Sequence, residues 1–102
     1  MLVLMSARRL KPGAFDQFRR AWEAPDGDYP PGFQRAYHAR NIRDEDEIIS
    51  FGLFDGSIEE LRAWRADHEQ EELKRQDAMA SFVENIHVEG IYEVIDEVGP
   101  SS

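Results

Sequence analysis

Apolar and polar side chains follow two different periods along the chain, and the change of period predicts strands and helices in a definite order. Residues 2–10 begin with apolar side chains at consecutive positions, which is typical of a strand covered on both faces. From Ala14 to Trp22 the apolar positions recur with helical spacing, and Pro25 is expected to end this helix. A hairpin, a long helix and a last strand follow, so the predicted order is β-α-β-β-α-β.

The middle of the chain predicts a hairpin and then a capped helix. Residues 33–43 and 47–54 are the two predicted strands, with Asp44-Glu45-Asp46 as the turn between them. Ser57-Ile-Glu-Glu60 has the form of a capping box, in which the serine oxygen accepts a hydrogen bond from an amide in the first turn. The apolar stripe changes phase near Asp67-His68, which predicts a kink or a break in the long helix.

The end of the chain predicts a last strand, which completes the order of elements of a known fold. Residues 86–95 alternate between apolar and polar side chains, which predicts a strand, and residues 99–102 are expected to form a flexible tail. The order matches the split-βαβ, ferredoxin-like pattern, an α+β fold in which two helices cover one face of an antiparallel four-stranded sheet. We expect a single domain over residues 1–98.

Both faces of the predicted sheet are apolar, although two helices can cover only one of them. In the first strand Leu2 and Leu4 lie on one face, and Val3 and Met5 lie on the other. The third strand also has apolar side chains on both faces, with Phe51 on one of them. Left in water, the face without helices would expose an apolar patch of roughly several hundred Å², which is uncommon for a soluble monomer. The sequence therefore predicts a homodimer whose sheets pack face to face about a two-fold axis.

The composition of the chain argues against several classes of binding partner and of chemical site. The chain has 102 residues and a formal net charge of −9, which disfavours nucleic acid and anionic membrane surfaces. It has no cysteine, so disulfides, thiolate metal sites and a cysteine nucleophile are excluded. The apolar run at residues 1–5 is too short for a signal peptide or a spanning helix, so we expect no membrane association and a cytoplasmic location.

Charge is also distributed unevenly along the chain. Residues 1–43 are net basic, whereas residues 44–102 are strongly acidic. Either the two halves neutralise each other when they fold, or the basic half forms a patch for an anionic ligand. Charge counts do not separate these two interpretations.

Three stretches resemble one known family. Pro31-Gly-Phe33 enters a strand, Ile48-Ile-Ser-Phe-Gly-Leu-Phe54 forms the next, and Ser57-Ile-Glu-Glu-Leu-Arg-Ala-Trp64 begins a helix. With the element order, they resemble the antibiotic-biosynthesis-monooxygenase-like (ABM) family of the dimeric α/β-barrel superfamily. The resemblance implies a homodimer whose two sheets form a barrel, with a pocket in each subunit between sheet and helices. Activities in this superfamily range from cofactor-independent oxygenation of aromatic polyketides through polyketide cyclisation and signal-molecule isomerisation to haem degradation, and many members have no known activity.

The haem-degrading branch is a poor match. Its members are similar in having an Asn on the first strand, a Trp on the second helix and a His ten residues after that Trp. Trp64 fits the pattern, but Lys74 stands ten residues later, and Ser6 and Ala7 occupy the place of the Asn. Glycine-rich nucleotide-binding motifs are also missing from the sequence. We therefore expect no haem and no other cofactor.

His38 and Arg40 are the candidate catalytic residues. A symmetric hairpin would place His38 opposite Gly52 and Arg40 opposite Ser50. The glycine would leave a gap in which a neutral imidazole takes a proton from a phenol or an activated carbon acid. Arg40 or Tyr37 would then stabilise the developing oxyanion. The alternative is a histidine at the surface or at the dimer interface.

The binding residues are predicted on the same reasoning. His68 follows Trp64 by one helical turn, so the pair could form an aromatic wall with a proton acceptor, or His68 could simply pack on the indole at a helix end. His87 and Glu89 would supply only two metal ligands, so no metal site is expected. The predicted substrate-binding residues are Tyr37, Gly52, Trp64 and His68.

Two functions from different classes fit the sequence. The first is a small cofactor-independent monooxygenase-like protein that acts on an aromatic or polyketide-like small molecule. The second is a non-catalytic dimeric protein with a small-ligand-binding or accessory role. The sequence leaves open whether the protein is an enzyme.

Overall fold

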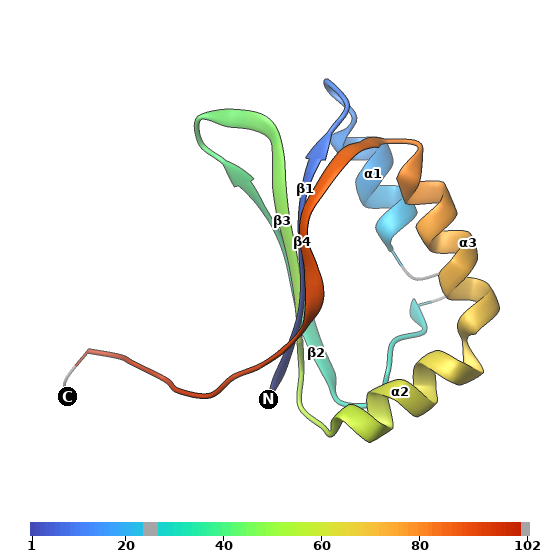
Figure 1. Cartoon of the computed structure of the whole chain (residues 1–102), viewed down its shortest axis with the longest axis vertical. Helices are drawn as coiled ribbons and strands as arrows, with labels where there is room; N and C mark the ends of the chain where they lie inside the picture. Colours follow the sequence, from blue (N-terminus) through green and yellow to red (C-terminus); the bar gives the residue numbers. More distant parts are fainter. Residues whose placement is uncertain (24–26, 101–102) are drawn as a thin grey trace.

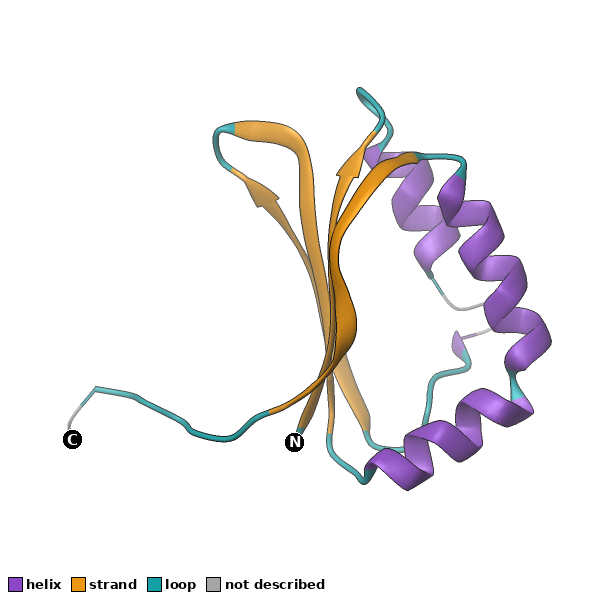
Figure 2. Ribbon diagram, in the orientation of Figure 1, coloured by secondary structure: helices purple, strands orange, loops and turns teal. Residues whose placement is uncertain are grey.

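The computed structural model describes residues 1–23 and 27–100, and within them an antiparallel four-stranded sheet carries three helices on one face (Figures 1 and 2). The spatial order of the strands is β2-β3-β1-β4. The predicted ferredoxin-like order is confirmed. The elements are β1 (Leu2–Leu10), α1 (Phe15–Trp22), β2 (Phe33–Asn41), β3 (Asp44–Phe54), α2 (Ile58–Asp67), α3 (Glu69–Ala80) and β4 (Val83–Glu93).

The helices follow the sequence pattern closely. Ser57 caps α2 by accepting a hydrogen bond from the Glu60 amide at 3.1 Å, as the capping box predicts. The long helix breaks at His68, where α2 ends and α3 begins. α1 ends at Trp22, and the predicted breaker Pro25 lies outside the described residues, as do the last two residues of the predicted tail. In residues 1–23 and 27–100 no helix is long and apolar enough to cross a membrane.

The turn of the hairpin differs from the prediction. β2 continues to Asn41 and β3 begins at Asp44, so the turn is Ile42-Arg43 instead of residues 44–46. Asn41 Oδ1 accepts a hydrogen bond from the Arg43 amide at 2.8 Å, a side-chain contact that favours a turn at this point. Asp44 in turn pairs with Arg9 of β1, which holds the start of β3 in the sheet.

This turn and an irregularity beside Arg40 together shift the register of β2 and β3 by two residues from the predicted one. His38 lies opposite Ser50, and Arg40 lies opposite Ile48, so the predicted pairs His38–Gly52 and Arg40–Ser50 are wrong. An irregularity beside Arg40 accommodates the additional residues of β3. Because the shift is an even number, each side chain stays on its predicted face of the sheet.

The helix-facing side of the sheet has two small apolar cores with a polar stretch between them. One core lies at each end of β1, around Leu2 and around Leu10. Between these two positions the helix-facing side chains of β1 include Ser6 and Arg8, both buried, and Ser50 of β3 lies opposite Ser6. The core is therefore interrupted in the middle of the sheet.

The other face of the sheet has no helix over it in the described residues (Figure 2). It carries apolar and aromatic side chains that remain partly accessible, among them Tyr37, Ile49, Val88 and Tyr92, which is 45% exposed. The prediction that both faces are apolar is confirmed. Beyond β4, residues 94–100 extend away from the body of the protein (Figure 1).

Candidate functional site

A cavity of about 440 Å³ lies between the sheet and the helices. It opens where the apolar core is interrupted, and Ser6, Ser50 and Gly52 form part of its floor. These side chains are too small to reach the helices, so the space above them stays unfilled. The volume falls within the range of about 300–1,000 Å³ that is usual for small-molecule sites.

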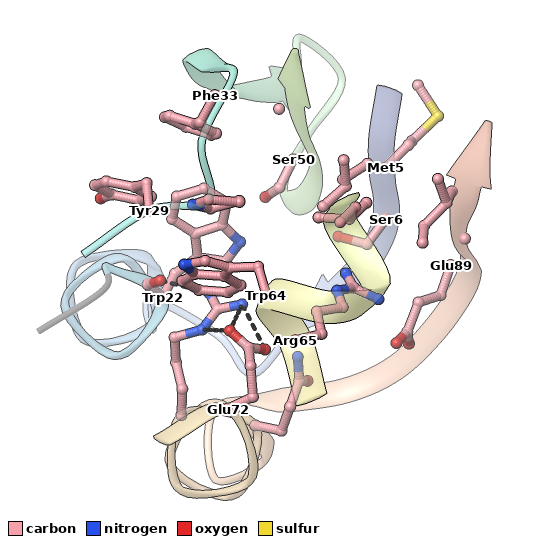
Figure 3. Close-up of a pocket in the computed structure, with 18 of the residues that line it drawn as sticks. Met5, Ser6, Trp22, Tyr29, Phe33, Ser50, Trp64, Arg65, Glu72 and Glu89 are labelled. Carbon is pink, nitrogen blue, oxygen red and sulfur yellow. Dashed lines mark hydrogen bonds and ion pairs between the residues drawn. The ribbon is translucent and has the colours of Figure 1, made fainter. Parts of the chain in front are cut away.

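The cavity has an aromatic side and a polar side (Figure 3). Trp22, Tyr29, Phe33 and Trp64 gather on one side, while Ser6, Ser50 and Glu89 lie on the other. The rings of Tyr29 and Phe33 are stacked, with their centroids 4.5 Å apart. Aromatic walls of this kind favour a flat aromatic molecule.

Gly52 has a different effect from the one predicted. A Cβ atom at this position would lie 3.3 Å from Cε2 of Phe33, so glycine lets that ring pack closely over β3. The space beside Gly52 therefore holds a wall of the cavity and not an imidazole.

His38 lies behind the floor of the cavity. Its Nδ1 is 2.7 Å from Oγ of Ser50, and its ring lies edge-on to Trp22 with the centroids 4.7 Å apart. Phe15 and Phe18 of α1 also pack against the imidazole. Burial lowers the pKa of His38, and the positive charge of Arg19 adds to this effect. The ring is therefore neutral at neutral pH, and the Ser50 hydroxyl connects it to the cavity.

Of the other predicted site residues, some line the cavity and some lie away from it. Gly52 and Trp64 line the cavity. Tyr37 points to the opposite face of the sheet, where it stacks on Phe51 with the centroids 5.2 Å apart. Arg40 lies over the ring of Phe15, 5.1 Å from its centroid, instead of at the cavity. The structure thus brings neither Tyr37 nor Arg40 to the cavity or to His38's partner Ser50.

His68 packs on Trp64, which was the simpler of the two interpretations of this pair. The two rings are stacked with their centroids 4.1 Å apart, and His68 Nδ1 lies 2.8 Å from the Trp64 carbonyl oxygen. Nε2 forms an ion pair with Asp28 at 2.9 Å. His68 therefore holds the Trp64 ring at the cavity wall and ties it to the segment that carries Tyr29.

His68 should make the stability of the protein depend on pH. The hydrogen bond to the Trp64 carbonyl raises the pKa of His68, and the charge of Asp28 adds to this effect. The folded protein therefore binds the proton more tightly than the unfolded chain, whose histidine pKa is about 6.5. The stabilisation is complete below that value and is lost as the pH rises through the higher pKa of the folded state.

Urea unfolding of wild type and His68→Gln at several pH values measures this effect. The difference in unfolding free energy between the two proteins should shrink as the pH rises from below the ordinary imidazole pKa to well above it. His38 has a lowered pKa and acts in the opposite direction, but it is present in both proteins and cancels in the difference. A difference that stays constant over this pH range would contradict the role of His68.

Arg75 of α3 anchors the far end of α1. It forms two hydrogen bonds with the Glu72 carboxylate, at 3.0 and 3.1 Å, and donates a third to the Trp22 carbonyl oxygen at 2.6 Å. This carbonyl is one of those that a helix end leaves without a partner. All three residues line the cavity, so the contact holds the end of α1, which carries Trp22, beside the cavity.

Solved structures share this architecture, whereas no family model matches the chain and no curated protein matches its sequence significantly. SnoaB, a cofactor-independent oxygenase from Streptomyces nogalater, is 14% identical and has a TM-score of 0.70 over 97% of each chain. A candidate antibiotic biosynthesis monooxygenase from Chloroflexus aurantiacus is 19% identical, with a TM-score of 0.63 over 96% of each chain. An uncharacterized NIPSNAP domain protein from Burkholderia xenovorans is 15% identical, with a TM-score of 0.59 over 99% of this chain and 100% of that one. This chain has the ABM-like fold.

Within the ABM-like fold, several cavity residues were missed by the sequence analysis. The apolar helical stripe that includes Trp22 favoured core packing over a place in an aromatic-binding cavity, and Tyr29 lies in a stretch, residues 25–32, whose composition predicts only a loop. Ser6 and Arg8 carry the signal that could have revealed a site, because both are polar residues on the helix-facing side of an otherwise apolar strand. In residues 1–23 and 27–100, no group of three or more His, Cys, Asp or Glu side chains could hold a metal ion.

Proposed function

We propose that this chain is a small cofactor-independent monooxygenase-like protein that acts on an aromatic or polyketide-like small molecule. The observation that carries the proposal is the Ser50–His38 pair at the floor of an aromatic-walled cavity. The fold shared with SnoaB supports it, since that protein is a cofactor-independent oxygenase.

The pair can remove a proton from a bound substrate in two linked transfers. A substrate with an acidic C–H group beside an aromatic ring or a ketone gives its proton to Oγ of Ser50, while the serine proton moves to Nδ1 of His38. This transfer requires a neutral imidazole with its proton on Nε2, so that Nδ1 accepts the hydrogen bond from the Ser50 hydroxyl. Burial lowers the pKa of His38 and so favours the neutral ring at neutral pH.

Dioxygen then reacts with the carbanion. The carbanion is oxidised and dioxygen reduced as a C–O bond forms, which gives a peroxide on the carbon that lost the proton. Cleavage of the O–O bond, with loss of the second hydrogen of that carbon, leaves a carbonyl group and releases hydroxide. The hydroxide takes back the proton that His38 holds, so one oxygen atom ends in the product and the other in water.

An assay with anthrone and ¹⁸O₂ tests the proposal. Wild-type protein should consume oxygen and produce anthraquinone that carries one ¹⁸O atom in its new carbonyl group. The measurements are oxygen uptake and the mass of the product. Anthrone that binds without oxygen uptake above the protein-free rate would contradict the proposal and favour the non-catalytic small-ligand-binding role.

The protein would act as a homodimer. The open face of the sheet supports this inference, because Tyr37, Ile49, Val88 and Tyr92 remain partly exposed on it. The tail also carries apolar side chains that contact little of their own chain, such as Ile95, which is 88% exposed. A second copy laid across the open face would cover this surface. A cytoplasmic location stays a prediction.

A further inference from the structure

Arg8 is a buried cation inside the cavity. Arg8 is only 5% exposed to solvent, yet it lines the cavity from the middle of β1. The guanidinium donates a hydrogen bond to Oγ of Ser6 and lies 5.4 Å from the centroid of the Phe18 ring. None of the ion pairs in the described part of the chain includes Arg8. A buried charge without a counter-ion is costly, so its retention in the cavity requires a reason.

Neighbouring charges leave Arg8 without close compensation. Arg75, which lines the same cavity, is already paired with Glu72. Asp28 is paired with His68. Burial lowers the pKa of Arg8, the negative charge of Glu89 raises it from beyond ion-pair distance, and the positive charge of Arg75 lowers it further. Arginine nonetheless stays protonated in proteins, so the cavity keeps a fixed positive charge on its polar side.

We propose that Arg8 binds the anionic group of the cavity's ligand and that this ligand is an aromatic carboxylate. The inference rests on the proposed function in using the same cavity, and it names the substrate class. A guanidinium presents parallel N–H donors that match the two oxygens of a carboxylate. The aromatic wall formed by Trp22, Tyr29, Phe33 and Trp64 takes the ring of the same molecule.

Two ligands of the same shape and different charge test this inference. Anthracene-9-carboxylate is fluorescent and anionic, and anthracene-9-carboxamide is its neutral counterpart. Titration of each with the wild-type protein should show that the acid binds more tightly, by roughly ten- to a hundredfold, because charge-assisted hydrogen bonds add about 1.5–3 kcal/mol. Arg8→Gln should remove this preference and leave the affinity for the amide nearly unchanged.

Control variants separate Arg8 from general charge effects. Arg9→Gln removes the next arginine of β1, which points to the other face and pairs with Asp44, so it should keep the preference for the acid. Arg65→Gln removes an exposed arginine at the cavity rim, and this variant should also keep most of the preference for the acid. If Arg8→Gln does not fold, Arg8→Lys provides a second test. Lysine keeps the positive charge but lacks the two parallel N–H donors of the guanidinium, so the preference for the acid over the amide should be reduced.

Several results would overturn the inference. They are equal binding of acid and amide to the wild-type protein, no binding of either, a preference that survives Arg8→Gln, and a preference that disappears in Arg65→Gln instead. The probe lacks the CH₂ group that the oxygenation consumes. Binding of the probe therefore does not depend on turnover. If the anthrone assay shows no oxygenation, the measured preference for the acid over the amide still tests the role of Arg8.

Discussion

Replacement of His38 by glutamine should lower kcat/KM for anthrone oxygenation by about 10²- to 10⁴-fold, the usual contribution of a general base. Glutamine can still contact Oγ of Ser50, but it cannot accept and hold a proton at neutral pH. Because the imidazole packs against rings of α1, the folded state should be checked by circular dichroism.

The pH profile distinguishes a base from a packing residue. A base must be unprotonated, so kcat/KM of the wild type should fall as the pH drops through the pKa of His38. Burial places this pKa below its ordinary value, so the fall should begin in more acidic solution than about 6.5. His38→Gln should lack this acid limb.

Two further variants complete the experiment. Ser50→Ala breaks the connection between the cavity and His38 and should lose activity to a similar degree. His87→Gln removes an exposed histidine of β4 and serves as the matched control, with activity close to wild type. A His38→Gln protein that is folded and fully active would remove His38 from the mechanism.

Introduction of a carboxylate on the open face, by Phe51→Glu, should convert the protein from dimer to monomer. Phe51 lies on β3, one of the two central strands, and stacks on Tyr37. Burial of about 400 Å² of apolar surface on each subunit would contribute roughly 10 kcal/mol per subunit before the costs of association. Two buried carboxylates related by the two-fold axis would raise the dimer dissociation constant by about 10³-fold or more.

Light scattering coupled to size-exclusion chromatography measures this effect at micromolar concentration. Wild type should elute at twice the mass of the chain and Phe51→Glu at the mass of one chain. Ile42→Glu adds the same charge at a turn residue that is 99% exposed, and it should stay dimeric. A wild-type protein that is monomeric under these conditions would show that the open face needs no second copy.

The element order could be read from the sequence because it depends on local periodicity. The break at His68 and the cap at Ser57 are contacts between residues close in the chain, and both were predicted correctly. The face that each strand residue occupies was also predictable, since side chains alternate with a period of two whatever the register.

The partners of His38 could not be predicted in the same way. Its position opposite Ser50 depends on the turn at Ile42-Arg43 together with the irregularity beside Arg40, and Asp44 at the start of β3 pairs with Arg9, a residue 35 positions away. A contact over that distance leaves no periodic signal in the sequence. The register, and with it the Ser50–His38 pair, was therefore decided by the tertiary structure.

The sequence by itself determined the ferredoxin-like order and the two apolar faces of the sheet, because both follow from spacing along the chain. Only the tertiary structure decided where the cavity lies and which side chains meet in it. The small residues of β1 and β3 become a floor only when Trp22, from α1, and Trp64, from α2, are brought above them. Packing between distant segments, and not the local pattern, creates the space beside the buried Arg8.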